Sequence, residues 1–345
     1  MISYLKEKIG LIVVLIIAEI GVNHNGCMNT AKKLIDVAVQ SGADIVKFQT
    51  FKSNELTTDI APLAEYQLKN SPEFTNQKKL LSKLELSEKN HILLKNYAED
   101  LGIEFLSTGF TMQSIDLLAR IGIRRWKVPS GEINNIPLLR KIALQNQPTI
   151  LSTGMCTLGE IELALKTLYE SNLQKDKISV LHCNSAYPTP MEDVNLKAIR
   201  TMRECFDITV GYSDHTCGIE ASIAAVAIGA QIIEKHITLD KNMQGPDHKA
   251  SIEPEELHNL VSAIRNVEKA LGNGIKKPSN SEIKNINVVR KSIVASDHIE
   301  KGDRYTTDNL CIKRPGTGLA PTMFDFLLGM KSNRKYNPND LIDLN

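Results

Sequence analysis

The chain has 345 residues, of which 42% are hydrophobic and 23% charged, as is usual for a globular protein with a sizeable core. Its formal net charge is +1 and no run of Lys and Arg is interleaved with aromatic residues, so nucleic acid is a poor candidate partner. The six cysteines are scattered without a C-x-x-C pair, which indicates reduced thiols and a cytoplasmic protein.

The first predicted element is a β-strand within the apolar run at residues 9–18. Two lysines precede this run, so a signal peptide is the alternative interpretation, but no small-x-small cleavage site follows it. The run is also too short to span a bilayer, so we expect no membrane partner. Its Val and Ile content favours a fully buried strand, with the first ten residues as a loosely held extension.

The same pattern, an apolar run that ends in polar residues, recurs along the chain. The runs are residues 11–26, 43–50, 103–110, 124–132, 148–155, 178–188, 207–216 and 231–240. Amphipathic helical stretches separate them, and several of these stretches close on glycine just before the next run. Strands that alternate with helices form parallel sheets, and eight such units predict a (β/α)₈ TIM barrel.

Two segments depart from this repeat. Residues 51–86 form a connection longer than a barrel needs, and such long connections are more often functional than idle. After the last barrel helix the sequence predicts a polar linker at 272–287, so that the barrel occupies 1–271. A small domain of short strands and turns follows at 288–345, and because it would be marginally stable alone we expect it to pack on something.

Polar residues stand at the ends of all the predicted barrel strands. In barrel enzymes the active site lies at the carboxyl ends of the strands, on the loops that follow them. One or two such residues could be satisfied within a barrel interior, but a polar end on every strand predicts a polar pocket. The residues at these ends include Glu19, Lys47, Thr108, Lys127, Ser130, Glu132, Ser152, Ser185, Tyr187, Ser213, His215, Glu234 and His236.

Two subsets of these residues point to particular chemistry. Lys47 and Lys127, among the hydroxyls of other strand ends, suit a phosphate or carboxylate, because Lys binds such groups as a point charge. No Walker-type loop is present, so a nucleotide is not indicated. His215 and His236 end adjacent predicted strands and could bind a divalent transition metal, with waters in the remaining positions. Glu234 shares its strand face with His236, whereas Lys235 faces the other way.

Several longer motifs resemble those of the sialic acid synthases, and the resemblance covers nearly the whole chain. The motifs are AEIGVNHNG at 18–26, VKFQTFK at 46–52, WKVPSGE at 126–132, ILSTGM at 150–155, LHCNSAYPTP at 181–190, GYSDHT at 211–216, IEKHITLD at 233–240 and GPDHKASIEP at 245–254. The tail, which includes KRPGTGL, resembles the antifreeze-protein-like (SAF) domain that ends these synthases. The resemblance implies an enzyme that condenses phosphoenolpyruvate with an N-acetylated hexosamine.

The resemblance also assigns roles to individual residues. It implies a Mn²⁺ ion, or Mg²⁺ or Co²⁺ in its place, on His215 and His236. It places phosphoenolpyruvate on Lys47, Thr108, Lys127, Ser130, Ser152 and Ser213, with Ser185 where some members have an asparagine in a phosphate contact. The family's catalytic and sugar-binding positions fall on Glu19, Asn70, Glu132, Tyr187, Glu234 and Asp247. Arg314 matches an arginine that reaches the sugar's N-acetyl group in a neighbouring subunit, which implies a domain-swapped homodimer.

The acceptor sugar is the open part of this interpretation. The first expectation is N-acetylmannosamine, which would give N-acetylneuraminic acid. The alternative is 2,4-diacetamido-2,4,6-trideoxymannose, which leads to legionaminic acid by the same chemistry, and a pseudaminic acid precursor is the third candidate. Two other readings are a Schiff-base aldolase that uses Lys47, Lys127 or Lys235, and a carbohydrate- or ice-binding module on an inert barrel. Glu19 and Glu234 are both candidates for acting on the attacking water.

Overall fold

Residues 13–344 are described by a computed structural model, in which the chain divides into two compact units, Met1–Asn273 and Gly274–Asn345. The predicted strand at 9–18 is confirmed where it falls within this range, because the first strand begins at Leu15. Residues 9–12 of that prediction lie outside the described residues. No helix within 13–344 has both the length and the apolar character that crossing a bilayer demands.

The first unit is a parallel barrel. Its strands are β1 (Leu15–Gly21), β2 (Ile45–Thr50), β3 (Glu104–Gly109), β4 (Trp126–Val128), β5 (Thr149–Ser152), β6 (Ile178–Cys183), β7 (Thr209–Asp214) and β8 (Ile232–His236). The hydrogen-bonded order is β3-β2-β1-β8-β7-β6-β5-β4, and the two end strands, β3 and β4, lie against each other, so the sheet is nearly closed. Each strand falls inside a predicted run, which confirms the predicted TIM barrel.

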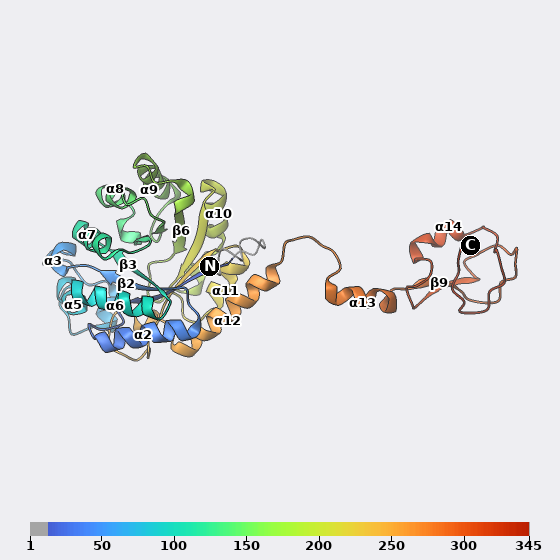
Figure 1. Ribbon diagram of the computed structural model, residues 1–345, viewed down its shortest axis with the longest axis horizontal. Helices are drawn as coiled ribbons and strands as arrows, with labels where there is room; N and C mark the ends of the chain where they lie inside the picture. The colour runs from blue at the N-terminus through green and yellow to red at the C-terminus, as the bar shows by residue number, and fades with distance from the viewer. Residues whose placement is uncertain (1–12, 345) are drawn as a thin grey trace. The chain divides into compact units, whose positions relative to one another are not determined.

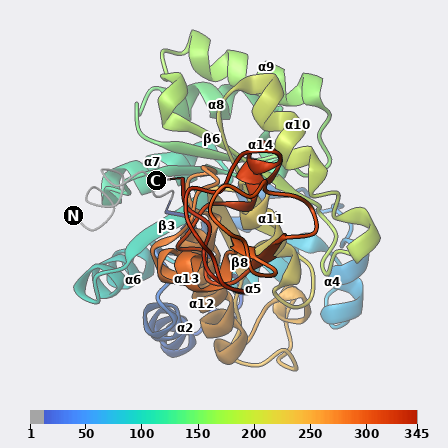
Figure 2. The same ribbon diagram turned by 90° about the vertical axis from the view of Figure 1, so that its right-hand side faces the viewer.

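Amphipathic helices surround these strands and run in chain order around them (Figures 1 and 2). They are α2 (Met28–Ser41), α6 (Glu88–Asp100), α7 (Met112–Ile121), α8 (Ile136–Ala143), α9 (Leu158–Glu170), α10 (Lys197–Phe206), α11 (Glu220–Ala227) and α12 (Pro254–Leu271). The main core lies between them and the outward faces of the strands: Leu34 and Ile35 of α2, for example, pack there with Val46 of β2. Gly42 ends α2 with a φ of 81°, a left-handed conformation that a residue with a side chain rarely adopts.

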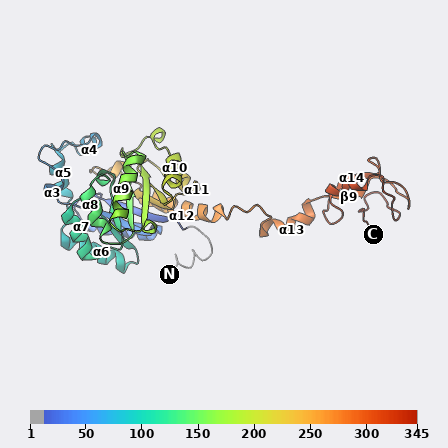
Figure 3. The ribbon, with the colours of Figure 1, turned by 90° about the horizontal axis from the view of Figure 1, so that it is seen from above.

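The long connection at 51–86, called the insertion below, folds as three short helices. These are α3 (Ser53–Leu56), α4 (Glu65–Asn70) and α5 (Gln77–Leu84), which lie together at one side of the barrel (Figure 3). The insertion has an apolar cluster of its own, in which Leu63, Leu80 and Leu84 pack with Val22 and Phe51. The segment is therefore held in place by a small core that is separate from the main one.

The second unit also has its own core. Its elements are α13 (Asn280–Val289), the antiparallel strands β9 (Ser292–Ala295) and β10 (Leu310–Lys313), and α14 (Phe324–Leu327). Part of the predicted linker at 272–287 is therefore helical, because Ser279 and Glu282 form a capping box at the start of α13. Short 3₁₀ turns complete the two units: η1 (Ser130–Glu132), η2 (Lys175–Lys177), η3 (Met191–Asp193), η4 (His248–Ala250) and η5 (Pro321–Met323).

Candidate active site

A cavity of about 440 Å³ opens at the carboxyl ends of the barrel strands, which is the size of a small-molecule site. Most of the predicted site residues meet there, although their strands are far apart in the sequence. Those that line the cavity are Glu19, Lys47, Thr108, Lys127, Ser130, Ser152, Ser185, Tyr187, Ser213, His215, Glu234, His236 and Asp247.

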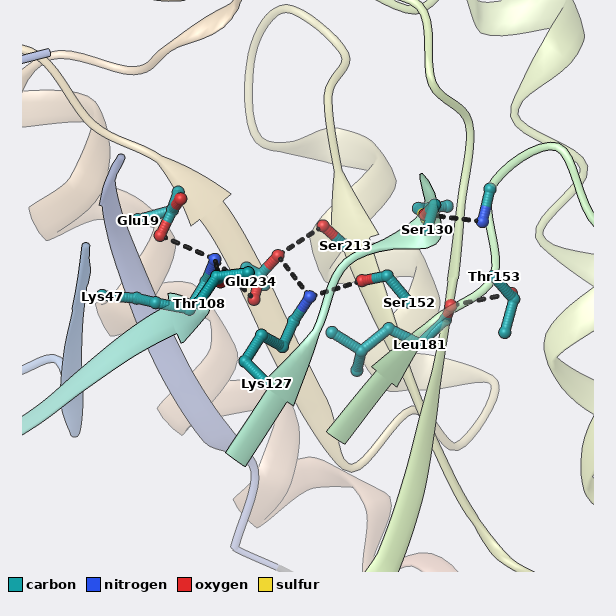
Figure 4. Close-up of polar contacts among 12 residues, drawn as sticks. Glu19, Lys47, Thr108, Lys127, Ser130, Ser152, Thr153, Leu181, Ser213 and Glu234 are labelled. Atoms are coloured by element: carbon teal, nitrogen blue, oxygen red, sulfur yellow. Dashed lines mark hydrogen bonds and ion pairs between the residues drawn. The ribbon is translucent and has the colours of Figure 1, made fainter. Parts of the chain in front are cut away.

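Two buried lysines and two buried glutamates form the floor of this cavity. Glu234 lies between the lysines, 3.7 Å from the Nζ of Lys47 and 3.6 Å from that of Lys127 (Figure 4). Lys47 also contacts Glu19, at 2.9 Å, because the register of β1 and β2 sets these two residues side by side. The floor thus holds two ammonium groups within reach of one small anion.

Hydroxyl groups surround these charges. Lys47 donates to the Oγ1 of Thr108 at 3.1 Å, and Lys127 donates to the Oγ of Ser152 at 2.6 Å. Ser213 donates to Glu234 at 2.8 Å (Figure 4). The lysines and hydroxyls predicted to bind an anion therefore lie together, and in this structure several of them contact the carboxylate oxygens of Glu19 and Glu234.

Ser130 follows β4 and Ser185 follows β6, and both hydroxyls lie close to Gly154, which follows β5. A Cβ on Gly154 would come within 2.3 Å of the Oγ of Ser185 and 2.9 Å of that of Ser130. The amide of Gly154 donates to the Ser130 hydroxyl at 2.9 Å. Glycine is thus needed at this position of the ILSTGM motif, because any side chain would clash with two serines that line the cavity.

The two glutamates ionise over different pH ranges. Burial raises the pKa of Glu19 to about 7, although the ammonium of Lys47 opposes that shift. Burial acts in the same direction on Glu234, but the ammonium groups of Lys127 and Lys47 outweigh it and lower its pKa to about 2. At neutral pH Glu234 is therefore a carboxylate, whereas Glu19 can take up or release a proton.

His215 and His236 meet as the sequence predicted, with ring centroids 5.4 Å apart. The Nδ1 of His215 donates to the carbonyl of Asn184 at 2.5 Å, which leaves Nε2 with its lone pair. Burial lowers the pKa of His215 to about 4 and that of His236 well below its usual range, so both rings are neutral at pH 7. Neutral imidazoles, one of them oriented by a carbonyl, are suitable ligands for a divalent ion.

Other donors near the histidine pair are few. The Nδ1 of His236 is buried without a hydrogen-bond partner, 3.8 Å from the Oδ2 of Asp247. Within residues 13–344, no cluster of three or more His, Cys, Asp or Glu side chains is arranged as a metal site. Two imidazoles alone would leave the remaining positions of a bound ion to water or substrate, and the metal site stays a prediction.

Lys235 points away from the cavity, as the alternation of β8 predicted. Its Nζ lies 3.0 Å from the Oδ2 of Asp214 and donates to the carbonyl of Thr216 at 2.6 Å. Ser222 of α11 donates to the same Asp214 oxygen, also at 2.6 Å. This pair is fully buried in the barrel wall, so Lys235 is out of reach of a substrate in the cavity.

Three predicted site residues do not line the cavity. Glu132 accepts a hydrogen bond from Asn135, and Asn70 donates to the carbonyl of Pro246, next to Asp247. Arg314 belongs to the second unit, where its exposed guanidinium donates to the carbonyl of Val289. The roles that the resemblance gave to these three residues remain predictions.

The cavity also has walls that the sequence analysis did not assign residue by residue. The insertion and its neighbours contribute Phe51, Leu56, Thr57, Tyr66, Gln67, Gln77, Leu81, Leu84 and Phe110. The length of the 51–86 connection indicated a functional segment. Its apolar residues could not be assigned to the site, because in sequence they resemble ordinary core residues. The Tyr66 ring contacts that of Tyr187 in a tilted arrangement, with centroids 5.1 Å apart, and so joins the insertion to the β6 end of the site.

Known proteins resemble this chain along most of its length. The family model of the NeuB family matches residues 34–276. The N,N'-diacetyllegionaminic acid synthase of Campylobacter jejuni is 51% identical over 95% of this chain and 98% of its own, and that of Legionella pneumophila is 49% identical over 92% and 89%. The solved N-acetylneuraminic acid synthetase of Leptospira borgpetersenii matches with a TM-score of 0.71 at 36% identity, over 79% of this chain and 90% of that one. The chain therefore belongs to the NeuB family, as its resemblance to the sialic acid synthases predicted.

Proposed function

We propose that the protein condenses phosphoenolpyruvate with 2,4-diacetamido-2,4,6-trideoxymannose to give N,N'-diacetyllegionaminic acid and phosphate. The observation that carries this choice is the 51% and 49% identity, over nearly the whole chain, to two enzymes named for that product. It favours the alternative acceptor of the sequence analysis over the first expectation, N-acetylmannosamine. The chemistry at the reacting carbons is the same for both.

The floor of the cavity is the proposed seat of phosphoenolpyruvate. The phosphate and carboxylate groups of phosphoenolpyruvate would bind the ammonium groups of Lys47 and Lys127. In this structure these ammonium groups pair with protein carboxylates 2.9–3.7 Å away. The hydroxyls of Thr108, Ser130, Ser152 and Ser213 are additional donors. Charge-assisted hydrogen bonds in a buried site are the strong ones, so this seat suits a small multiply charged anion.

The proposed reaction joins C3 of phosphoenolpyruvate to the aldehyde carbon of the open-chain sugar. The aldehyde oxygen takes up a proton and becomes a hydroxyl, while C2 becomes electron-deficient and water adds to it. The new C2 hydroxyl then loses its proton and becomes the ketone as phosphate leaves with cleavage of its C–O bond. Glu234, which is ionised at neutral pH, stabilises the positive charge at C2. Glu19, whose pKa is about 7, takes the proton of the attacking water.

We further propose that His215 and His236 hold a divalent ion, with Mn²⁺ preferred and Mg²⁺ or Co²⁺ as alternatives. Such an ion would polarise the acceptor's aldehyde oxygen as a Lewis acid. The neutral state of both rings and the carbonyl that orients His215 support this assignment. The proposal also includes a cytoplasmic, domain-swapped homodimer, in which Arg314 contacts the acceptor bound to the neighbouring subunit; this part rests on the family resemblance.

The role of Glu19 predicts a pH dependence. Because the carboxylate is the active form, kcat/KM should rise as the pH increases through about 7 and level off above it. In Glu19→Gln this rise of kcat/KM with pH should disappear, and kcat/KM should fall about a hundredfold, which is the usual contribution of a general base. Glu65→Gln, at an exposed glutamate of α4, is the control and should keep the wild-type profile. A variant that retained the rise without Glu19 would contradict the assignment.

The acceptor is tested by competition. N-acetylmannosamine and 2,4-diacetamido-2,4,6-trideoxymannose are supplied at equal concentration with limiting phosphoenolpyruvate and Mn²⁺, and the two nine-carbon products are separated and quantified. We expect the diacetyl product to dominate. A preference for N-acetylmannosamine would overturn the proposed acceptor and restore the first expectation, whereas release of no phosphate with either sugar would overturn the synthase reaction itself.

A further inference from the structure

The cavity has two unlike ends. Its floor is charged, but the wall supplied by the insertion and its neighbours is apolar, with Phe51, Leu56, Leu81, Leu84 and Phe110 among the lining side chains. Phe51 and Phe110 pack edge to face, with centroids 6.0 Å apart. These side chains belong to the small core of the insertion, so the wall is fixed in shape. We call Leu56, Leu81, Leu84, Phe51 and Phe110 the apolar wall.

We propose that the apolar wall is the subsite for carbon 6 of the acceptor, and that it selects sugars with a methyl group there over sugars with a hydroxymethyl group. The inference rests on the proposed function and deepens it, because it assigns acceptor choice to particular residues. The aldehyde carbon has to meet the anion on the floor. The opposite end of a six-carbon chain then extends away from the strand ends, towards the insertion.

The apolar wall distinguishes the two kinds of sugar because it is an unfavourable environment for a hydroxyl group on carbon 6. A methyl group packed on leucine and phenylalanine side chains gains contacts and loses no hydrogen bond. A hydroxymethyl group in the same place gives up its bonds to water and finds no partner on the wall. An apolar pocket that faces such a difference typically discriminates by about 10- to 200-fold.

Two polar residues beside the wall use part of their hydrogen-bonding capacity within the insertion. The hydroxyl of Thr57 donates to the carbonyl of Ser53, and the Oε1 of Gln67 accepts the amide of Ala64. The Thr57 proton and the Gln67 Oε1 are therefore used within the insertion, and the five side chains of the apolar wall offer a hydroxyl no hydrogen-bond partner. Gln77, in the first turn of α5, also lines the cavity, and its amide matches the acetamido group that the proposed acceptor carries at carbon 4.

The test uses two sugars that differ at carbon 6 alone: N-acetylmannosamine and its 6-deoxy analogue. We expect the wild type to have a kcat/KM for the 6-deoxy sugar about tenfold or more above that for the parent. Leu81→Asn, which keeps the side chain's shape but adds an amide to the wall, should shrink this ratio about tenfold. Leu56→Asn is the second wall variant, should the first one fail to fold.

Leu80→Ala is the matched control. Leu80 lies next to Leu81 on α5 and packs in the same cluster, but it does not line the cavity. It should lower stability and leave the ratio of the two kcat/KM values unchanged, which separates a loosened insertion from a changed wall.

The outcomes distinguish this inference from the proposed function. Equal use of the two sugars by the wild type, or an unchanged ratio in the folded wall variants, would overturn the inference. This holds even if the diacetamido sugar is the best acceptor, because its acetamido group at carbon 4 would then account for the preference. Failure to use the diacetamido sugar, with the preference for the 6-deoxy analogue retained, would overturn the proposed acceptor and leave the assignment of the wall to carbon 6 in place.

Discussion

His236→Ala is expected to lower kcat about a thousandfold, because the proposed ion would lose one of its two imidazole ligands. A bound Lewis acid stabilises developing charge by several kcal/mol, and about 1.4 kcal/mol is a factor of ten in rate. His215→Ala should have a similar effect, since its ring lies 5.4 Å from that of His236. Exhaustive chelation of the wild type should abolish turnover, and added Mn²⁺ should restore it.

Metal binding is measured separately from turnover. Titration calorimetry with Mn²⁺ should show an affinity at least about a hundredfold weaker in His236→Ala, more than the loss of a ligand's supporting partner usually costs. His258→Ala removes an exposed histidine of α12 and should bind Mn²⁺ as the wild type does. Full activity of the wild type in metal-free buffer would exclude the ion from the mechanism.

Lys127→Met is expected to lower kcat/KM for phosphoenolpyruvate by roughly 150-fold. The ammonium is buried at the floor, 3.6 Å from Glu234, and supplies one of the two positive charges that face the anion. Losing charge-assisted hydrogen bonds to a bound anion costs about 3 kcal/mol, which corresponds to that factor. Methionine keeps most of the lysine's length, so the loss reports the charge rather than a cavity.

The control for this variant is Lys52→Met. Lys52 follows β2, is half-exposed, and pairs with Glu85 outside the cavity. Its variant should keep the wild-type KM for phosphoenolpyruvate, measured by phosphate release at saturating acceptor. An unchanged KM in Lys127→Met would mean that the anion sits elsewhere, and the seat proposed on the cavity floor would have to be abandoned.

The barrel could be predicted because its strands carry a strong local signal. Buried parallel strands read as apolar runs, and each run here ended in polar residues and led into an amphipathic helix. The helices of the insertion carried a weaker signal. Leu80 and Leu84 pack with Val22 and Phe51, which only the fold brings near them, and stretches of four to eight residues have little periodicity to detect.

The site could be predicted where the type of residue at a strand end is enough to indicate its role. Lys47, Lys127 and the two histidines meet because all carboxyl ends of a barrel's strands share one face. The division of labour between Glu19 and Glu234 was not predictable, since both are acids at strand ends. It depends on distances across the barrel, which place Glu234 between two lysines and Glu19 beside only one.

The buried pair of Lys235 and Asp214 has a consequence for how the barrel folds. A slip of one residue between β7 and β8 would turn Lys235 into the cavity and Glu234 or His236 into the wall. Asp214 would then face no ammonium, and an unpaired buried carboxylate costs about 3–5 kcal/mol. A charge pair that is out of reach of the substrate thus helps to set the register of β8, because a barrel closed with that strand one residue out of place would bury an unpaired charge.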